Sequence, residues 1–266
     1  MAEGQDNNSS FLASCCNESQ IAFCTLYIAY LVIVFLTWKT WIFKPMRLIA
    51  VFLHEISHAL ACWLTGGHVI GIEVNNNEGG VTKYIGGCRL LIIPAGYIGS
   101  AFWGMVFVVL SGGRKTATFA ASGFVVALLI SLCYSPNRFM IYLNLGYAIL
   151  TAAFIALEWH VFTPILTFII LFYGVCIGTF AIFDIIDDLI LRTVKGSDAY
   201  ACWERMPCCF PRCVGVQWLL IAVFMQFFGL WLAIVLMSEE CSNLSWLKCF
   251  AENIPDWDFD RQRRQL

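Results

Sequence analysis

Residues 46–65 read MRLIAVFLHEISHALACWLT, an apolar run that is long enough to cross a bilayer and carries His54, Glu55 and His58 near its middle. A hydrocarbon core of roughly 30 Å needs about 20 apolar residues of helix. Ionisable side chains inside such a run cost several kcal/mol unless they are paired or bound to a metal, and by default they mark functional sites. This stretch therefore indicates both the fold class and the place to look for chemistry.

The composition of the whole chain agrees with a membrane protein. Hydrophobic residues make up 60% of the 266 residues, charged residues make up 13%, and the mean hydropathy is +0.75. A soluble domain is about half apolar and about a quarter charged, so this chain has too few charges to cover a globular surface. The net charge of −2 offers no basic field for nucleic acid. Soluble, disordered, coiled-coil and nucleic-acid-binding classes are excluded.

Further runs without Asp, Glu, Lys or Arg also have the length of a membrane helix. They predict an all-α multi-pass membrane protein of about seven transmembrane helices, at residues 19–38, 46–65, 90–113, 116–137, 139–157, 159–183 and 213–238. The predicted organisation is a polar N-terminal segment (1–18), a polytopic membrane domain (19–238) and a polar C-terminal tail (239–266). Seven spans place the two ends on opposite sides of the membrane. The basic residues after the first span then predict an N-terminus outside the cell or in a lumen.

Residues 66–89, between the second and third spans, have a different pattern. Apolar residues alternate roughly over 69–74, turn-forming residues follow at 75–80, and residues 81–85 favour a β-strand. This pattern predicts a short β-hairpin. Because exposed sheet edges are not tolerated in hydrocarbon, we expect the hairpin to be covered by protein or to lie near water.

The pattern His54-Glu55-Ile56-Ser57-His58 is typical of a zinc site on a helix. Two His residues four apart lie on one face and can bind one Zn²⁺ through their imidazoles. Glu55 lies near the same face, where it can act as a general base and take a proton from a metal-bound water. The alternative interpretation is that His54 and His58 form hydrogen bonds across a helix bundle and bind no metal.

A catalytic zinc needs a third protein ligand and an open position for water. In FAIFDIIDDLIL (180–191), three acids at i, i+3 and i+4 share one face of an apolar helix: Asp184, Asp187 and Asp188. At 1.5 Å per residue, Asp184 and His58 each lie about 12 Å from the end of their own helix. We therefore predict Asp184 as the third ligand and Asp187 as the second choice. The remaining histidines, which we interpret as interfacial, are His68 and His160.

Four stretches resemble the site-2 protease group of intramembrane zinc metallopeptidases, in a short B-like branch. They are HEISHALACWLTGG (54–67), GIEVNNNEGGVTKY (71–84), PAGYIGSAFWG (94–104), and FDIIDD (183–188) followed by Ser197-Asp198-Ala199. The resemblance covers residues 46–237. It implies bound zinc and cleavage of a peptide bond within or beside a membrane helix. It also implies that His54 and His58 are metal ligands and that Glu55 is the general base.

The stretch that contains Pro94, Gly96, Gly99 and Ser100 has two interpretations. Small residues at helical spacing allow two helices to come close together. Pro94 and Gly96 also loosen a helix, which would offer backbone groups to an unwound substrate.

The sequence thus predicts an intramembrane zinc metalloprotease that hydrolyses a peptide bond in or near a transmembrane helix of a substrate protein by a zinc-activated water. One alternative is a catalytically inactive homologue that binds membrane helices. Another is a metal or proton transporter that uses the His/Asp cluster. The expected partners are a transmembrane protein substrate and the lipid bilayer, with no nucleic acid. The oligomeric state is open, and so is the choice between an endomembrane and the plasma membrane.

Overall fold

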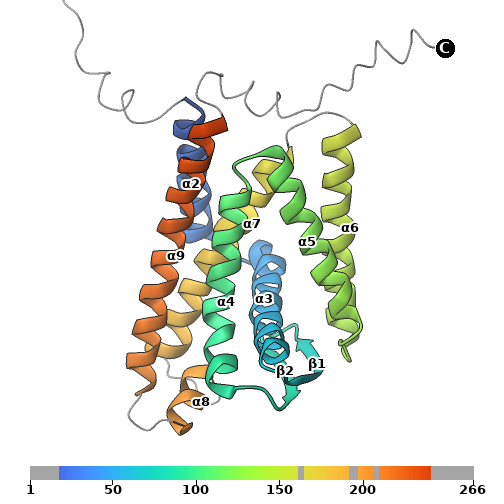
Figure 1. The fold of residues 1–266 in the computed structure, drawn as a ribbon, viewed down its shortest axis with the longest axis vertical. Helices are drawn as coiled ribbons and strands as arrows, with labels where there is room; N and C mark the ends of the chain where they lie inside the picture. The colour runs from blue at the N-terminus through green and yellow to red at the C-terminus, as the bar shows by residue number, and fades with distance from the viewer. Residues whose placement is uncertain (1–17, 161–164, 192–196, 206–209, 241–266) are drawn as a thin grey trace, which may run out of the picture.

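In a computed structural model, the chain folds as a bundle of long helices with a small two-stranded sheet at one end (Figure 1). The structure describes residues 18–160, 165–191, 197–205 and 210–240. The elements are α2 (Glu18–Thr37), η1 (Trp41–Phe43), α3 (Lys44–Leu64), β1 (His68–Val74), β2 (Gly80–Ile85), α4 (Arg89–Leu110), α5 (Arg114–Leu132), α6 (Arg138–His160), α7 (Ile165–Ile185), η2 (Ile186–Leu191), α8 (Asp198–Arg205) and α9 (Pro211–Glu240). Most of the predicted polar segments 1–18 and 239–266 lies outside the described residues.

The predicted fold class is confirmed. Seven described helices are long and apolar enough to cross a membrane. The predicted hairpin is also present, as an antiparallel pair of strands between α3 and α4. The fold is that of a multi-pass membrane protein.

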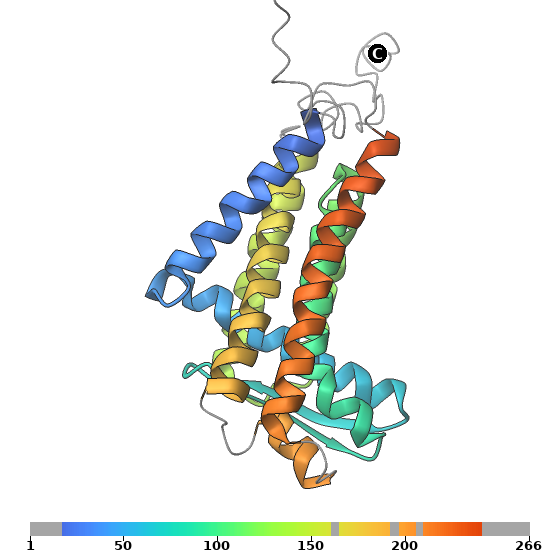
Figure 2. The ribbon, with the colours of Figure 1, turned by 90° about the vertical axis from the view of Figure 1, so that its left-hand side faces the viewer.

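The direction of α3 differs from that of the other long helices. The helices α4, α7 and α9 run along the molecule, whereas α3 lies across it (Figure 2). In both views α2 begins at the same end of the molecule where α9 finishes. The predicted arrangement, with the two ends on opposite sides, is therefore wrong for the described chain. It counted α2 and α3 as two upright spans, but together they pass only once from that end to the end with the hairpin.

The hairpin packs on the body of the molecule through β1. Val69, Ile72 and Val74 are buried in the core below the sheet. At the outer edge of β1, the Ile72 backbone N–H donates to the carbonyl oxygen of Tyr134, which follows α5, at 2.9 Å. The β1 edge is thus covered by protein, as expected for a strand near hydrocarbon.

Helices α4 and α7 pack closely at the centre of the bundle. A Cβ at Gly104 would collide with the backbone of Gly178, and a Cβ at Gly174 would collide with Val108. Small residues at a membrane-helix interface allow this close approach. As a result, the last turns of α7 lie beside the beginning of α4, at the same end of the molecule as the hairpin.

Candidate metal centre

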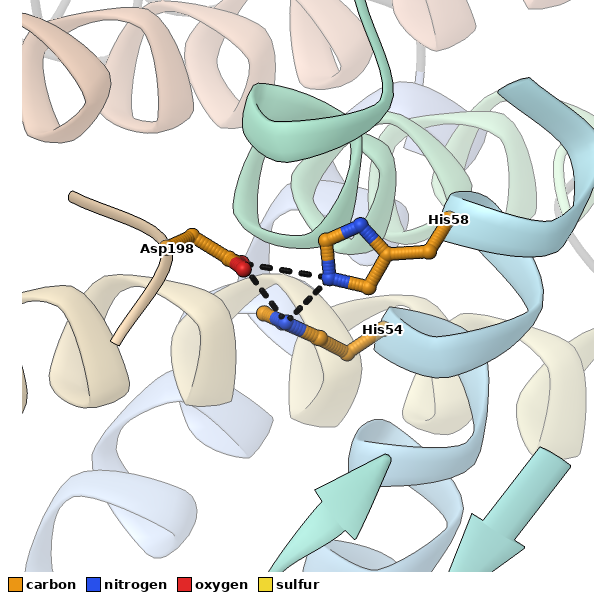
Figure 3. A group of neighbouring side chains, drawn as sticks. All are labelled: His54, His58 and Asp198. Atoms are coloured by element: carbon orange, nitrogen blue, oxygen red, sulfur yellow. Dashed lines mark hydrogen bonds and ion pairs between the residues drawn. The ribbon is translucent and has the colours of Figure 1, made fainter. Parts of the chain in front are cut away.

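Three side chains from two elements meet at this end of the bundle: His54 and His58 of α3, and Asp198, the first residue of α8 (Figure 3). The two histidine Nε2 atoms are 3.1 Å apart. Asp198 Oδ2 lies 3.1 Å from His54 Nε2 and 3.2 Å from His58 Nε2. Ligand atoms of a tetrahedral zinc ion with bonds of 2.0–2.1 Å lie about 3.3 Å from one another. The triangle therefore has nearly the size of three zinc-ligand positions.

A hydrogen bond from Nδ1 of His58 determines the state of its other ring nitrogen, Nε2, which faces His54 and Asp198. His58 Nδ1 donates to the carbonyl oxygen of Ile92 at 2.7 Å. With the proton on Nδ1, the Nε2 atom of a neutral imidazole points a lone pair at the Asp198 carboxylate. A lone pair and a carboxylate oxygen at this separation repel each other unless a proton or a metal ion lies between them. The donor set therefore fits a divalent cation.

Asp198 reaches the histidines because α8 begins beside them. Ser197 caps the helix: its carbonyl oxygen accepts from the Ala201 N–H at 2.9 Å, and its hydroxyl accepts from the Tyr200 N–H at 3.4 Å. Burial favours a raised pKa for the Asp198 carboxyl, but with a proton on the imidazoles the positive charge of His58 and the hydrogen bonds from His54 and His58 outweigh burial and hold its pKa well below the ordinary value. Asp198 therefore faces the histidines as a carboxylate.

The hairpin holds Glu55 beside this cluster. Glu55 is only 5% exposed. The Thr82 hydroxyl of β2 lies 2.7 Å from Glu55 Oε2 and 2.9 Å from the Glu55 backbone oxygen. A Cβ at Gly80 would collide with the Glu55 carboxylate, so a larger residue there would displace it. Strand β2 thus fixes the position of the predicted general base.

An ion pair ties the hairpin turn to the beginning of α3. Arg47 donates from Nε and from a terminal guanidinium nitrogen to the two carboxylate oxygens of Glu78, at 2.9 and 2.8 Å. Two donors on two acceptors fix the relative orientation of both side chains. Arg47 also donates to the carbonyl oxygens of Trp38 and Thr40, which connect α2 to α3.

On its other side the cluster is closed by α4. A Cβ at Gly96 would collide with the Nε2 atoms of both His54 and His58, and one at Gly99 would collide with Ser57. The interpretation of these small residues as close helix contacts is confirmed. The second interpretation, contact with an unwound substrate, stays a prediction. The Tyr97 ring packs edge-on against His54, with ring centroids 4.6 Å apart.

The cluster opens into a cavity of ≈ 440 Å³. Its floor is formed by α3, and its walls are formed by the hairpin, the beginning of α4, the end of α7 and α8. Asp184, the predicted third ligand, lines this cavity but is not part of the cluster, in which Asp198 lies against the two histidines. The prediction compared depths along two upright helices. Because α3 lies across the molecule, equal distance from a helix end does not give equal depth (Figure 2).

The other predicted site residues lie further away. Asp188 lines the cavity, whereas Asp187, the second choice, is not among its lining residues. Residues 186–191 form a π-helix, whose turn holds more residues than an α-helical turn. In this wider turn, Asp188 stays on the same face as Asp184, whereas Asp187 is rotated away from it. His68 and His160 are both exposed, as the interfacial interpretation expects.

A comparison with protein families identifies the chain. The family model described as Peptidase M50B-like matches residues 27–229. The chain belongs to this family. The match runs from α2 into α9 and contains every residue of the cluster, and it confirms the resemblance to the site-2 protease group. Comparisons with curated proteins and with solved structures found no match.

Within this Peptidase M50B-like chain, Asp198 is the member of the cluster that the predicted ligand set does not contain. A signal was present in Ser197-Asp198, since Ser followed by Asp is typical of a helix start. The same segment is one of the stretches that resemble the site-2 protease group. The prediction favoured the three acids of 184–188 over this signal, because those acids lie inside an apolar run.

Proposed function

We propose that the protein is an intramembrane zinc metallopeptidase that hydrolyses a peptide bond in or near a transmembrane helix of a substrate protein. One observation carries the proposal. Three metal-ligand atoms converge at 3.1–3.2 Å in a cavity that also holds the buried Glu55. Membership of a peptidase family supports it.

The residues have separate roles in the proposed reaction. His54, His58 and Asp198 would hold the ion. When bound, zinc polarises a carbonyl group and lowers the pKa of water at the site. Glu55 accepts a proton from the attacking water while the water oxygen bonds to the carbonyl carbon. The C–N bond then breaks, and Glu55 returns the proton to the leaving amine.

The deciding variant is Glu55→Gln, which keeps the size of the side chain but removes the base. Proton transfer by a positioned base contributes about 10²–10⁴-fold, so cleavage should fall by that factor. Zinc should stay near one equivalent per chain, because all three ligands remain. Both quantities are measured on protein purified in detergent. The substrates are the membrane proteins that accumulate uncut in cells carrying the variant.

A matched control is Glu73→Gln on β1. Glu73 pairs with Lys83 at 2.5 Å and is not among the residues that line the cavity. This variant should cleave as well as the native protein. If native protein and Glu55→Gln restore a deletion phenotype equally well, the protein is a helix-binding scaffold. If folded native protein binds no zinc, the metal centre is refuted.

A further inference from the structure

Tyr97 of α4 lies against the candidate metal centre and carries a hydroxyl group. It directly follows Gly96, where a Cβ would collide with the Nε2 atoms of His54 and His58. Tyr97 is only 4% exposed, yet it lines the cavity next to the cluster. Helix α4 therefore brings a phenol ring to the cluster, on the side away from the hairpin.

Two aromatic neighbours fix the Tyr97 ring. His54 of α3 meets it edge-on, with ring centroids 4.6 Å apart and ring planes at 87°. Trp218 of α9 packs against it with ring centroids 5.7 Å apart. Because the ring contacts two other helices, it has little freedom to rotate, and its hydroxyl is in place before a substrate arrives. A polar group that is already in position costs no reorganisation during a reaction.

The charged groups that act on the Tyr97 hydroxyl indicate where it points. They are the carboxylates of Asp184, Asp198, Asp188 and Glu55, and all four line the cavity. Because these acids come from α3, α7, η2 and α8, a hydroxyl that lies near all of them faces the space that they surround. Among the described residues, none shares a hydrogen bond with this hydroxyl. Its proton is therefore available to a ligand in the cavity.

The proposed reaction needs a donor at this place. A carbonyl oxygen gains negative charge when water attacks its carbon, and in this cavity that oxygen lies among carboxylates. The described lining contains no Lys or Arg that would balance the charge. A hydrogen-bond donor that is aimed at the oxygen stabilises the charge as it develops.

We propose that the Tyr97 hydroxyl donates a hydrogen bond to the carbonyl oxygen of the bond that is cut. This inference rests on the proposed function and adds a catalytic residue to it. As the water oxygen bonds to the carbonyl carbon, an electron pair of the C=O bond moves to the carbonyl oxygen, and the hydrogen bond from Tyr97 strengthens. Glu55 takes the proton of the water, whereas Tyr97 keeps its own. When the C–N bond breaks, the electron pair returns to the C=O bond.

Tyr84 of β2 also lines the cavity, but its surroundings differ. Arg89 is the first of the charged groups that act on its hydroxyl, ahead of Asp198. Its side chain is also more exposed than that of Tyr97. The contact with His54 and the four surrounding acids favour Tyr97 as the donor.

The test uses a transmembrane peptide from a membrane protein that accumulates uncut with Glu55→Gln, and a copy in which a phosphinate group replaces the amide that is cut. The phosphinate is tetrahedral and carries negative charge on oxygen, so it reports interactions that form only in the transition state. Tyr97→Phe keeps the ring and removes the hydroxyl. Its kcat should fall about 10²–10³-fold, with KM nearly unchanged. The phosphinate should bind about 10²-fold more weakly.

Binding of the uncut peptide separates a catalytic from a structural role. It is measured with zinc-loaded Glu55→Gln protein, and adding Tyr97→Phe should leave this affinity unchanged. Zinc content and unfolding temperature should also stay native, because the ring contacts remain. Tyr147→Phe is the matched control. It removes a tyrosine hydroxyl that lies 3.4 Å from Met46 Sδ, outside the cavity lining, and should keep the native kcat and phosphinate affinity.

The outcomes separate this inference from the proposed function. Native kcat and native phosphinate affinity in Tyr97→Phe overturn the inference and leave hydrolysis standing. Equal losses of affinity for the peptide and the phosphinate give Tyr97 a structural role and also overturn it. If the losses appear in Tyr84→Phe while Tyr97→Phe stays native, the donor lies on β2 and the inference is wrong. If no membrane protein accumulates uncut with Glu55→Gln, hydrolysis itself is overturned and the inference falls with it.

Discussion

Two groups of ionisable side chains lie at opposite ends of this molecule, and they differ in how their charges are balanced. At the end away from the hairpin, Arg114 and Glu158 are 2% and 0% exposed. Arg114 Nε donates to Glu158 Oε1 at 2.6 Å, and a terminal guanidinium nitrogen donates to the Glu158 backbone oxygen at 2.7 Å. The second carboxylate oxygen accepts from the Leu166 N–H at 2.9 Å, at the beginning of α7. This pair joins α5, α6 and α7.

The cluster at the hairpin end contains no such permanently charged cation. The Nε2 atoms of His54 and His58 converge with a carboxylate oxygen of Asp198, and the Thr82 hydroxyl bonds to Glu55 beside them. An ion pair with matched charges stabilises helix contacts, whereas converging ligand atoms need a proton or a metal cation between them. The comparison teaches that burial of charge alone does not mark a functional site. The balance of donors and acceptors within the cluster does.

The largest expected effect concerns the third metal ligand. Asp198→Ala should remove most of the zinc from the purified protein, because it deletes one of three converging ligand atoms. Asp184→Ala removes a carboxylate from the same cavity but no atom of the triangle, so zinc should stay near one equivalent. Metal analysis after dialysis against a weak chelator measures both.

The opposite result would return the third-ligand role to our sequence-based choice. If Asp184→Ala empties the site while Asp198→Ala keeps its zinc, the start of α8 does not supply the ligand. A variant with both histidines replaced, His54→Ala with His58→Ala, sets the level expected for an empty site in the same measurement.

The next effect is expected at the other cluster and should appear in stability. Arg114→Met leaves Glu158 as an uncompensated buried charge, which costs about 3–5 kcal/mol. Thermal unfolding in detergent should occur at a clearly lower temperature, while the zinc content of the folded protein is unchanged. Adding Glu158→Gln should recover most of the loss, since no unpaired charge remains and the amide oxygen can still accept from the Leu166 N–H. A double variant as unstable as Arg114→Met would show that the charge balance is not the cause.

Much of this architecture was predictable because it depends on local sequence. The apolar runs located the seven long helices, with ends that differ by up to six residues, and the turn-forming stretch 75–80 located the hairpin. The spacing of His54 and His58 also follows from one helix alone, since residues four apart share a face. Each of these features needs no information about neighbouring elements.

Features that depend on how elements pack were not predictable in this way. The direction of α3 is set by its contacts with α4, α7 and the sheet, and nothing in its own sequence encodes that direction. Asp198 reaches the histidines only because the chain returns to the cavity after α7. The π-helix that separates Asp187 from Asp188 is likewise a property of the packed backbone. The acidic triplet in an apolar helix therefore pointed to the cavity that holds the cluster, but not to the acid that lies against the two histidines.

The smallest expected effect tests whether the hairpin takes part in the chemistry or only covers it. Thr82→Val preserves shape but removes the hydroxyl that lies 2.7 Å from Glu55 Oε2. Loss of such an orienting partner typically costs about 10–100-fold in activity. We therefore expect cleavage to fall by this factor, with zinc content and unfolding temperature unchanged.

Thr82→Ser keeps the hydroxyl and should retain most of the activity. Thr116→Val, which removes an exposed hydroxyl from the first turn of α5, is the matched control and should behave as native protein. Native activity in Thr82→Val would mean that Glu55 is held by packing against Gly80 alone, and β2 would then be a cover for the site with no part in positioning the base.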